Sequence, residues 1–137
     1  MNFPNARNRI VVDTDVVSYL FGNQPQAGSF EPLLSGKSLA VSFMTIAELY
    51  YGAYKKNWGE RQLKKLENHL KNYVVLPYDF DVCLEWAKIK TYCDKNGCCI
   101  ENSDCWIAAT AIKYKCSLAT NNKKHFINIE GLELIFA

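Results

Sequence analysis

The chain has 137 residues, of which 49% are hydrophobic and 22% are charged, and this composition predicts one globular domain over residues 1–137. Its formal net charge of +2 permits nucleic acid as a partner without requiring one. The residues before Ile10 contain no apolar segment of signal-peptide length, and no later run has the length of a membrane helix. We therefore expect a cytoplasmic protein that makes no use of a membrane.

The six cysteines do not follow the pattern of a disulfide framework or of a zinc site. A chain of this length with an ordinary core does not need disulfides, and several of the cysteines fall in helical patterns. Cys93, Cys98 and Cys99 are close in sequence, but there is no Cys-x-x-Cys pair and neither histidine is near them. We predict free thiols.

Strand and helix patterns alternate from the start of the chain. A β-branched run at 9–13 predicts a strand that ends in an acid, and residues 16–21 are helical in pattern. A loop and a short helix ending near 35–36 come next, followed by a strand at 39–43 and a helix that opens at 44–49. The leucine spacing of 57–70 predicts an amphipathic helix, which can form a projecting hairpin with the helix before it.

The same alternation continues to the C-terminus. A strand at 73–77 is stopped by proline, and a long helix begins at Asp79 or Asp81 and ends at 95–97. A nearly apolar helix opens around Asp104, and strands at 117–120 and 132–136 complete the chain, with a short turn between them. The predicted class is α/β, a three-layer α/β/α domain with a mostly parallel central sheet and right-handed crossovers.

Three carboxylates, Asp13, Glu48 and Asp104, each stand where a strand or apolar run gives way to a helix. Asp13 ends the first strand, and we place Glu48 and Asp104 in the first turns of their helices. Parallel strands end on the same side of a sheet, and ligands bind in the crevice beyond those ends. We therefore expect the three acids to converge although they are far apart in sequence.

Such a cluster, with no lysine or arginine in its motifs, is electrostatically unfavourable. The acids repel one another, which raises their pKa values unless a cation lies among them. Mg²⁺ and Mn²⁺ take oxygen ligands and commonly serve phosphoryl chemistry. The cluster thus predicts metal-dependent hydrolysis of a phosphodiester.

These three motifs, in this order and spacing, resemble those of the PIN-domain ribonucleases, and more narrowly the VapC-type toxins of bacterial type II toxin–antitoxin pairs. The resemblance covers nearly the whole chain and rests on residues 10–17, 45–52 and 102–111. Its most specific piece is the Asp-x-x-Ile-Ala-Ala element that starts at Asp104. It implies a PIN-like fold and a ribonuclease in which Asp13, Glu48 and Asp104 hold Mg²⁺ or Mn²⁺.

The fourth motif of the family has the form Thr-x-Asn-x-x-acid-Phe, and residues 120–126 depart from it at one position. His125 stands where many members carry Asp or Glu. Because the fourth acid helps to hold a second metal, the resemblance implies one firmly bound ion here, with Asn122 and His125 completing the site through water. Further candidates for supporting roles are Thr14, Asn102 and Thr120.

The resemblance also implies substrates and partners. Similar proteins cut structured RNA, often transfer RNA, through a metal-activated water that attacks the phosphodiester in line. They work as homodimers and are neutralised by a cognate antitoxin whose C-terminal segment fills the active-site groove. The lysine pairs at 55–56, 64–65 and 123–124 either track an RNA backbone or form an ordinary solvated face.

Several of these acids also have a structural interpretation. Thr45-x-x-Glu48 has the form of a capping box. Asp104 can compensate a helix dipole, with Ser103 or its neighbour as the cap. Asp13 is harder to explain in this way, because a carboxylate that ends a buried strand needs donors or a cation.

Two rival functions stay open at this point. The Asp-x-Asp-x form of residues 13–16 is that of haloacid-dehalogenase-type phosphatases, whose first Asp is a nucleophile. Such enzymes need a later lysine and an acidic metal pair, and the element at Asp104 has no place in them. The other rival is a non-catalytic PIN-like module that binds RNA or a partner. If the chain is instead a PIN domain, we expect Asp15 to cap the first helix or to support the metal indirectly.

Overall fold

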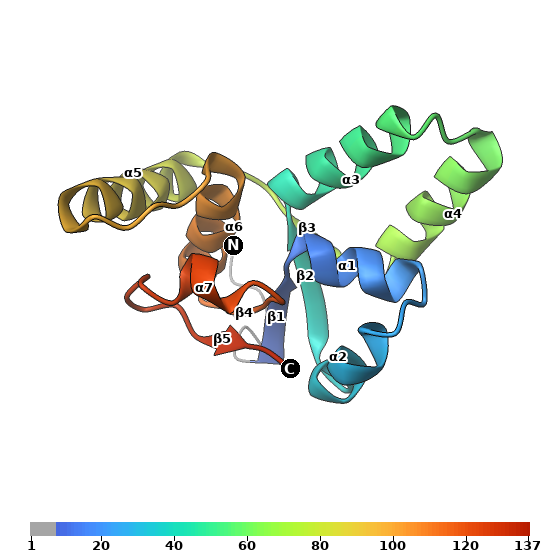
Figure 1. The fold of residues 1–137 in the computed structure, drawn as a ribbon, viewed down its shortest axis with the longest axis horizontal. Coiled ribbons are helices and arrows are strands. Elements are labelled where there is room, and N and C mark those ends of the chain that lie inside the picture. Colours follow the sequence, from blue (N-terminus) through green and yellow to red (C-terminus); the bar gives the residue numbers. More distant parts are fainter. Residues whose placement is uncertain (1–7) are drawn as a thin grey trace.

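A computed structural model describes residues 8–137, so residues 1–7, where the sequence predicts no signal peptide, lie outside the described part. Its strands are β1 (Arg9–Val12), β2 (Ser38–Ser42), β3 (Val74–Leu76), β4 (Ser117–Ala119) and β5 (Leu134–Ile135). Its helices are α1 (Thr14–Phe21), α2 (Ala27–Leu34), α3 (Phe43–Lys55), α4 (Glu60–Leu70), α5 (Phe80–Asn96), α6 (Asn102–Lys113) and α7 (Lys123–Phe126). The predicted alternation of strands and helices is confirmed (Figure 1).

The strands form one parallel sheet in the order β3-β2-β1-β4-β5. At its centre, Ile10 of β1 pairs with Leu39 of β2, and Val12 pairs with Ala119 of β4. The chain runs from β1 outward through β2 and β3, and then returns to β4 on the other side of β1. In open α/β sheets, ligands bind at such a switch point, beyond the carboxyl ends of the strands. This topology places a site directly after Val12 and Ala119.

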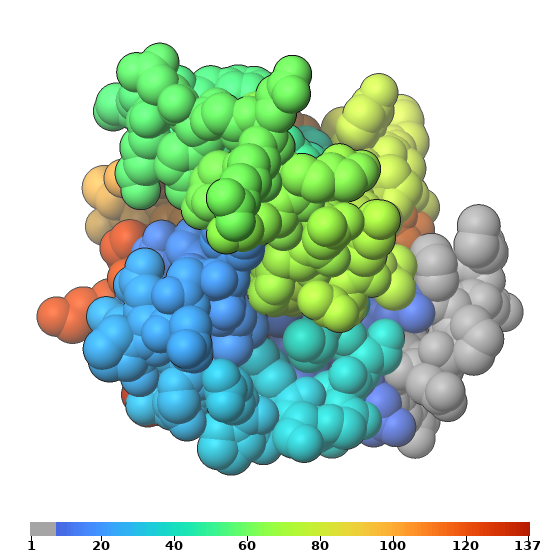
Figure 2. Space-filling view, turned by 90° about the vertical axis from the view of Figure 1, so that its right-hand side faces the viewer, coloured from blue at the N-terminus to red at the C-terminus, as the bar shows by residue number. Residues whose placement is uncertain are grey.

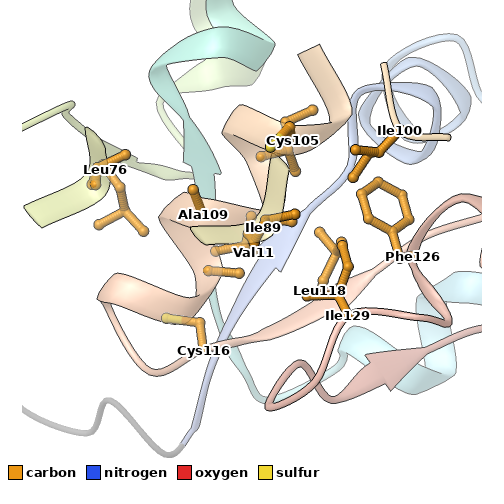
Figure 3. Close-up of a cluster of buried hydrophobic side chains, with 14 of the residues drawn as sticks. Val11, Leu76, Ile89, Ile100, Cys105, Ala109, Cys116, Leu118, Phe126 and Ile129 are labelled. Atoms are coloured by element: carbon orange, nitrogen blue, oxygen red, sulfur yellow. The ribbon is translucent and has the colours of Figure 1, made fainter. Parts of the chain in front are cut away.

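Helices cover both faces of the sheet, with α5 and α6 on one side and α1 and α2 on the other (Figure 1). Successive side chains of a strand point to opposite faces, so β1 contributes to two cores. Val11 packs with Leu118 and with residues of α5 and α6 in the cluster drawn in Figure 3, whereas Ile10 and Val12 pack with residues of α1 and α2. The three-layer α/β/α prediction is confirmed.

The start of α3 changes the interpretation of Glu48. Ser42, the last residue of β2, caps this helix, and its hydroxyl accepts the backbone N–H of Met44 at 3.1 Å. Thr45 therefore lies inside the helix, and the predicted capping box of Thr45 and Glu48 is wrong. Glu48 lies in the second turn of α3 and not in the first. Its carboxylate is left without a capping role.

Two other predicted caps are also wrong. Asp13 itself caps α1, so Asp15 lies within the first turn of that helix. The N-cap of α6 is Glu101, and residues 102–103 are already helical. Asp104 does occupy the first turn of α6, as predicted. Both Asp13 and Asp104 therefore lie near the positive end of a helix dipole.

Outside the sheet, α3 and α4 project as the predicted hairpin (Figure 1). A short helix, α7, replaces the turn predicted between the last two strands, and its Phe126 is fully buried in the cluster of Figure 3. All six cysteines are free, as predicted. None of the helices within residues 8–137 is long and apolar enough to cross a membrane.

Candidate active site

Asp13 lies directly after β1 and has only 4% of its surface exposed. Its backbone N–H extends the sheet by donating to the carbonyl oxygen of Ala119 at 2.9 Å. One carboxylate oxygen accepts the N–H of Thr14 and the other accepts the hydroxyl of Thr120, each at 2.8 Å. Because these donors come from α1 and from the residue after β4, Asp13 is held in place at the switch point of the sheet.

Glu48 reaches the same edge from α3. The hydroxyl of Thr14 donates to its carboxylate at 2.8 Å and lies 2.9 Å from the hydroxyl of Thr45. A hydroxyl has one proton, so Thr45 donates to Thr14 while Thr14 donates to Glu48. Thr45 is fully buried, and the sequence suggested for it only a capping role. Two threonines thus connect Glu48 to the start of α1, directly beside Asp13.

Asp104 of α6 is contacted from α7 by His125. The imidazole Nδ1 lies 2.9 Å from Oδ2 of Asp104, and the exposed fractions of the two side chains are 49% for His125 and 16% for Asp104. The sequence did not indicate this contact of His125 with an acid. Both residues line a pocket of about 310 Å³ together with Cys99, Ile100 and Glu101.

A further polar link crosses the same edge between Asn122 and Asp15. The side-chain amide of Asn122 donates to the Asp15 carboxylate at 2.8 Å, and its backbone N–H donates to the Thr120 hydroxyl at 2.9 Å. These bonds tie the loop after β4 to α1. Asn102, the remaining candidate for a supporting role, is exposed at the first position of α6.

Burial raises the pKa of each of the three acids, and neighbouring carboxylates add to the rise. The pKa of Asp13 is raised to about 6: burial is the main cause, the charges of Asp104 and Asp15 add to the rise, and hydrogen bonds from Thr120 and Thr14 oppose it. Burial likewise raises the pKa of Glu48, with added contributions from Asp104 and Asp15. Burial also raises the pKa of Asp104, and His125 opposes this effect. Residues from three separate elements thus supply carboxylates whose pKa values are raised, so that each is harder to ionise than usual.

The chemistry of this cluster fits a hard divalent cation. Among residues 8–137, His125 is the only basic side chain within salt-bridge distance of Asp13, Glu48 or Asp104. As the side chains stand, no three His, Cys, Asp or Glu groups of the described chain converge closely enough to hold an ion by themselves. Mg²⁺ keeps several waters and binds through one or two carboxylates, so water can complete its coordination here.

A cavity of about 220 Å³ lies beside Glu48, between α1, α3 and α4. Glu48, Lys56 and Trp58 are among its lining residues. The ring of Phe21, at the end of α1, lies 5.9 Å from the ring of Trp58 and 5.5 Å from that of His69 on α4. Figure 2 shows this face of the molecule, with α3 and α4 above α1 and α2. The acidic edge therefore continues into a recess beneath the α3–α4 hairpin.

Residues 10–132 match the profile of the family described as PIN domain. The chain belongs to the PIN-domain family. Ribonuclease VapC1 of Haemophilus influenzae (strain R2866) is 33% identical over 125 residues, which cover 90% of this chain and 93% of that protein. The tRNA(fMet)-specific endonuclease VapC of Shigella flexneri is 27% identical over 124 residues, which cover 90% of this chain and 94% of that protein. The resemblance to VapC-type PIN domains is confirmed.

Solved structures of VapBC proteins agree with this assignment. VapBC2 from Rickettsia felis, bound to a DNA fragment from its promoter, has a TM-score of 0.83 at 27% identity and covers 94% of this chain and 98% of that one. VapBC-1 from nontypeable Haemophilus influenzae has a TM-score of 0.81 at 32% identity and covers 93% and 97%. Because the PIN-domain match includes residues 13–16, the interpretation of that segment as a dehalogenase-type motif loses its basis.

Proposed function

We propose that this PIN-domain protein is a metal-dependent endoribonuclease that hydrolyses RNA phosphodiester bonds as the toxin of a toxin–antitoxin pair. One observation carries the proposal: Asp13 after β1, Glu48 of α3 and Asp104 of α6 gather at the switch point of the sheet. The ribonuclease names of the VapC relatives support the reaction class.

The three acids are the proposed ligands of Mg²⁺ or Mn²⁺. A divalent ion bound there supplies a polarised water nucleophile and stabilisation of the leaving oxygen. The chain itself keeps these carboxylates ionised and holds them in a fixed orientation. Thr120 and Thr14 do this by donating to Asp13 and Glu48, because each of these hydrogen bonds lowers the pKa of the carboxylate that burial raises.

The proposed substrate is structured RNA, with transfer RNA as the first choice. The relative from Shigella flexneri is named for tRNA(fMet). On the present chain, Lys56 lines the cavity beside Glu48, and the adjacent Lys55 lies over the ring of the exposed Tyr51 at 5.8 Å. Lysines contact phosphates, and exposed aromatic rings stack on bases. We therefore place the incoming RNA along α3, in the cytoplasm where transfer RNA is found.

Two protein partners belong to the proposal. The first is a cognate antitoxin, whose C-terminal segment would occupy the cavity beneath the α3–α4 hairpin. The second is another copy of this chain, which would cover apolar side chains such as Tyr54, Tyr78 and Phe80, now 63%, 68% and 77% exposed. Light scattering of the purified protein checks the dimer, since a monomer at micromolar concentration would contradict it.

The function is tested by incubating the purified protein, freed of any partner, with total transfer RNA and Mg²⁺ or Mn²⁺. The wild type is compared with Asp104→Asn, with a chelator, and with the matched control Asp94→Asn, which makes the same change at an exposed position of α5. We expect discrete cleavage products from the wild type and the control. We expect none from Asp104→Asn or after chelation.

Two outcomes would contradict the proposal. Cleavage that survives both the chelator and Asp104→Asn would mean that the acids are not the catalytic centre. No cleavage by well-folded protein with either metal would favour the non-catalytic module, in which His125 at the fourth acidic position marks the loss of activity. Such a module would still bind transfer RNA but would not cleave it.

A further inference from the structure

His125 places a nitrogen ligand at the outer side of the carboxylate cluster. Its Nδ1 lies 2.9 Å from Oδ2 of Asp104. Adjacent ligands of one octahedral ion with bonds of about 2.1 Å lie about 3.0 Å apart. The nitrogen and the oxygen thus already have the spacing of two atoms that share one metal ion, and an ion bound by both would replace the proton of their hydrogen bond, which is released to solvent.

The backbone that carries His125 is well anchored. Its neighbour Phe126 is fully buried and lies near Ile100 and Leu118 in the core cluster of Figure 3. The N–H of His125 donates to the carbonyl oxygen of Asn122 at 2.9 Å. The imidazole itself is half exposed and faces the 310 Å³ pocket that it shares with Asp104. This pocket offers room for an ion with several of its waters.

The other polar residue of this segment is already engaged elsewhere. The side-chain amide of Asn122 donates to Asp15, and its backbone N–H donates to Thr120. Asn122 therefore serves to join the loop after β4 to α1. His125 is left as the side chain from this segment that meets Asp104.

We propose that His125 binds the metal ion at Asp104 directly and shifts the preference of the site from Mg²⁺ toward transition ions such as Mn²⁺. The inference rests on the proposed metal-dependent function and adds the identity of the preferred ion. Mg²⁺ takes oxygen ligands and gives up its waters reluctantly, whereas imidazole nitrogen suits transition ions. Mn²⁺ accepts carboxylate oxygen as Mg²⁺ does, and it also bonds to imidazole. An acid in place of His125 would add a negative charge and favour Mg²⁺.

The direct bond is tested by electron spin-echo spectroscopy of Mn²⁺ bound to the untagged protein, which detects ¹⁴N coupling from a coordinated imidazole. The chain has two histidines, so His69→Gln is the control for the other ring. Cys99→Ser is a second control, because it removes the thiol from the same pocket and keeps the imidazole. We expect the nitrogen coupling in the wild type and in both controls. It should be absent from His125→Gln and His125→Glu.

The preference is tested by calorimetric competition between the two ions, without RNA. We expect the ratio of Mn²⁺ affinity to Mg²⁺ affinity to fall on the order of tenfold in His125→Glu. Thermal melts of each variant confirm folding, and the exposed position of His125 makes both substitutions tolerable.

The outcomes separate this inference from the function on which it rests. Mn²⁺ binding without nitrogen coupling, and with the same ion preference in His125→Glu, would overturn the inference and leave His125 as a hydrogen-bond partner that orients Asp104. RNA cleavage would then still require the three acids. If neither ion binds the wild type, the metal-dependent function fails together with the inference.

Discussion

The two halves of the carboxylate site are built in different ways. In the inner half, Asp13 and Glu48 receive hydrogen bonds from Thr120, directly after β4, and from Thr14, at the start of α1. In the outer half, Asp104 meets a half-exposed imidazole on a helix of only four residues. The sheet therefore determines the geometry of the inner half, whereas a single side chain decides the character of the outer half.

This difference suggests a division of labour. Hydroxyl and backbone donors orient the inner carboxylates, and because these donors are neutral, the negative charge that would attract the ion stays on the acids. The outer position carries a side chain that can be exchanged without disturbing the core. We therefore expect changes in the inner half to cost activity, and changes at His125 to alter the choice of ion.

The largest expected effect comes from removing an inner acid. Asp13→Asn keeps the shape of the side chain and removes the charge of a proposed metal ligand, so we expect kcat/KM on a labelled RNA to fall about a thousandfold or more. In His125→Gln we expect kcat/KM to fall much less at saturating Mn²⁺. Equal losses in the two variants would erase the proposed distinction between the halves.

A smaller effect is expected from the threonine that aims Glu48. Thr14→Val keeps the size of the side chain and removes the hydroxyl that donates to Glu48. Loss of a hydrogen bond that orients a metal ligand typically costs 10-fold to 100-fold, so we expect about a tenfold fall in cleavage at limiting metal. The matched control is Thr91→Val on the exposed side of α5. A fall of the same size in the control would show that the effect is not local.

The inner half should also make the metal-free protein sensitive to pH. Because burial raises the pKa of Asp13 from its ordinary 3.8 to about 6, folding disfavours its anion, and stability falls as the pH rises between these values. We expect the unfolding free energy to be about 1 kcal/mol higher at pH 5 than at pH 7 on account of this group. Urea melts of wild type and Asp13→Asn, in the presence of a chelator, measure the difference.

The asparagine variant should lack this contribution, and Mn²⁺ should remove it from the wild type by stabilising the anion. A difference between wild type and Asp13→Asn that does not change with pH would contradict the assignment of the shift to Asp13.

The smallest effect concerns the RNA path outside both halves. Lys56→Ala removes one cation from the cavity beside Glu48, and we expect RNA affinity to fall about twofold to threefold with a salt dependence weaker by about one phosphate contact. Lys37→Ala is the control, because Lys37 lies just before β2, at the amino ends of the strands, whereas the acids lie at their carboxyl ends. Binding titrations at several salt concentrations distinguish the two. An equal effect in both variants would place the RNA elsewhere.

The positions of Asp13 and Asp104 were predictable because local signals are strong at both. A β-branched run precedes Asp13, and an apolar helical stretch follows Asp104. The position of Glu48 within α3 could not be predicted, because Ser42 and Thr45 are both good helix caps and the sequence alone does not choose between them. Because β2 ends at Ser42 and α3 begins at the next residue, Ser42 is the cap.

The contacts that complete the site depend on packing between distant segments. Thr14 and Thr45 are 31 residues apart and meet only when α3 lies beside α1. His125 and Asp104 are separated by 21 residues, and α7 is too short to show helical periodicity in the sequence. Such contacts follow from the register of the helices on the sheet, which the pattern of apolar residues does not specify.

The central claim is that three acids from three elements share one metal ion. A crystal structure of the protein soaked in Mn²⁺, with anomalous data that locate manganese, tests it most directly. We predict a manganese peak at the carboxyl ends of β1 and β4 that Asp13, Glu48 and Asp104 all contact, directly or through waters of the ion. The absence of a peak there at saturating Mn²⁺, in protein that still cleaves RNA, would contradict the claim.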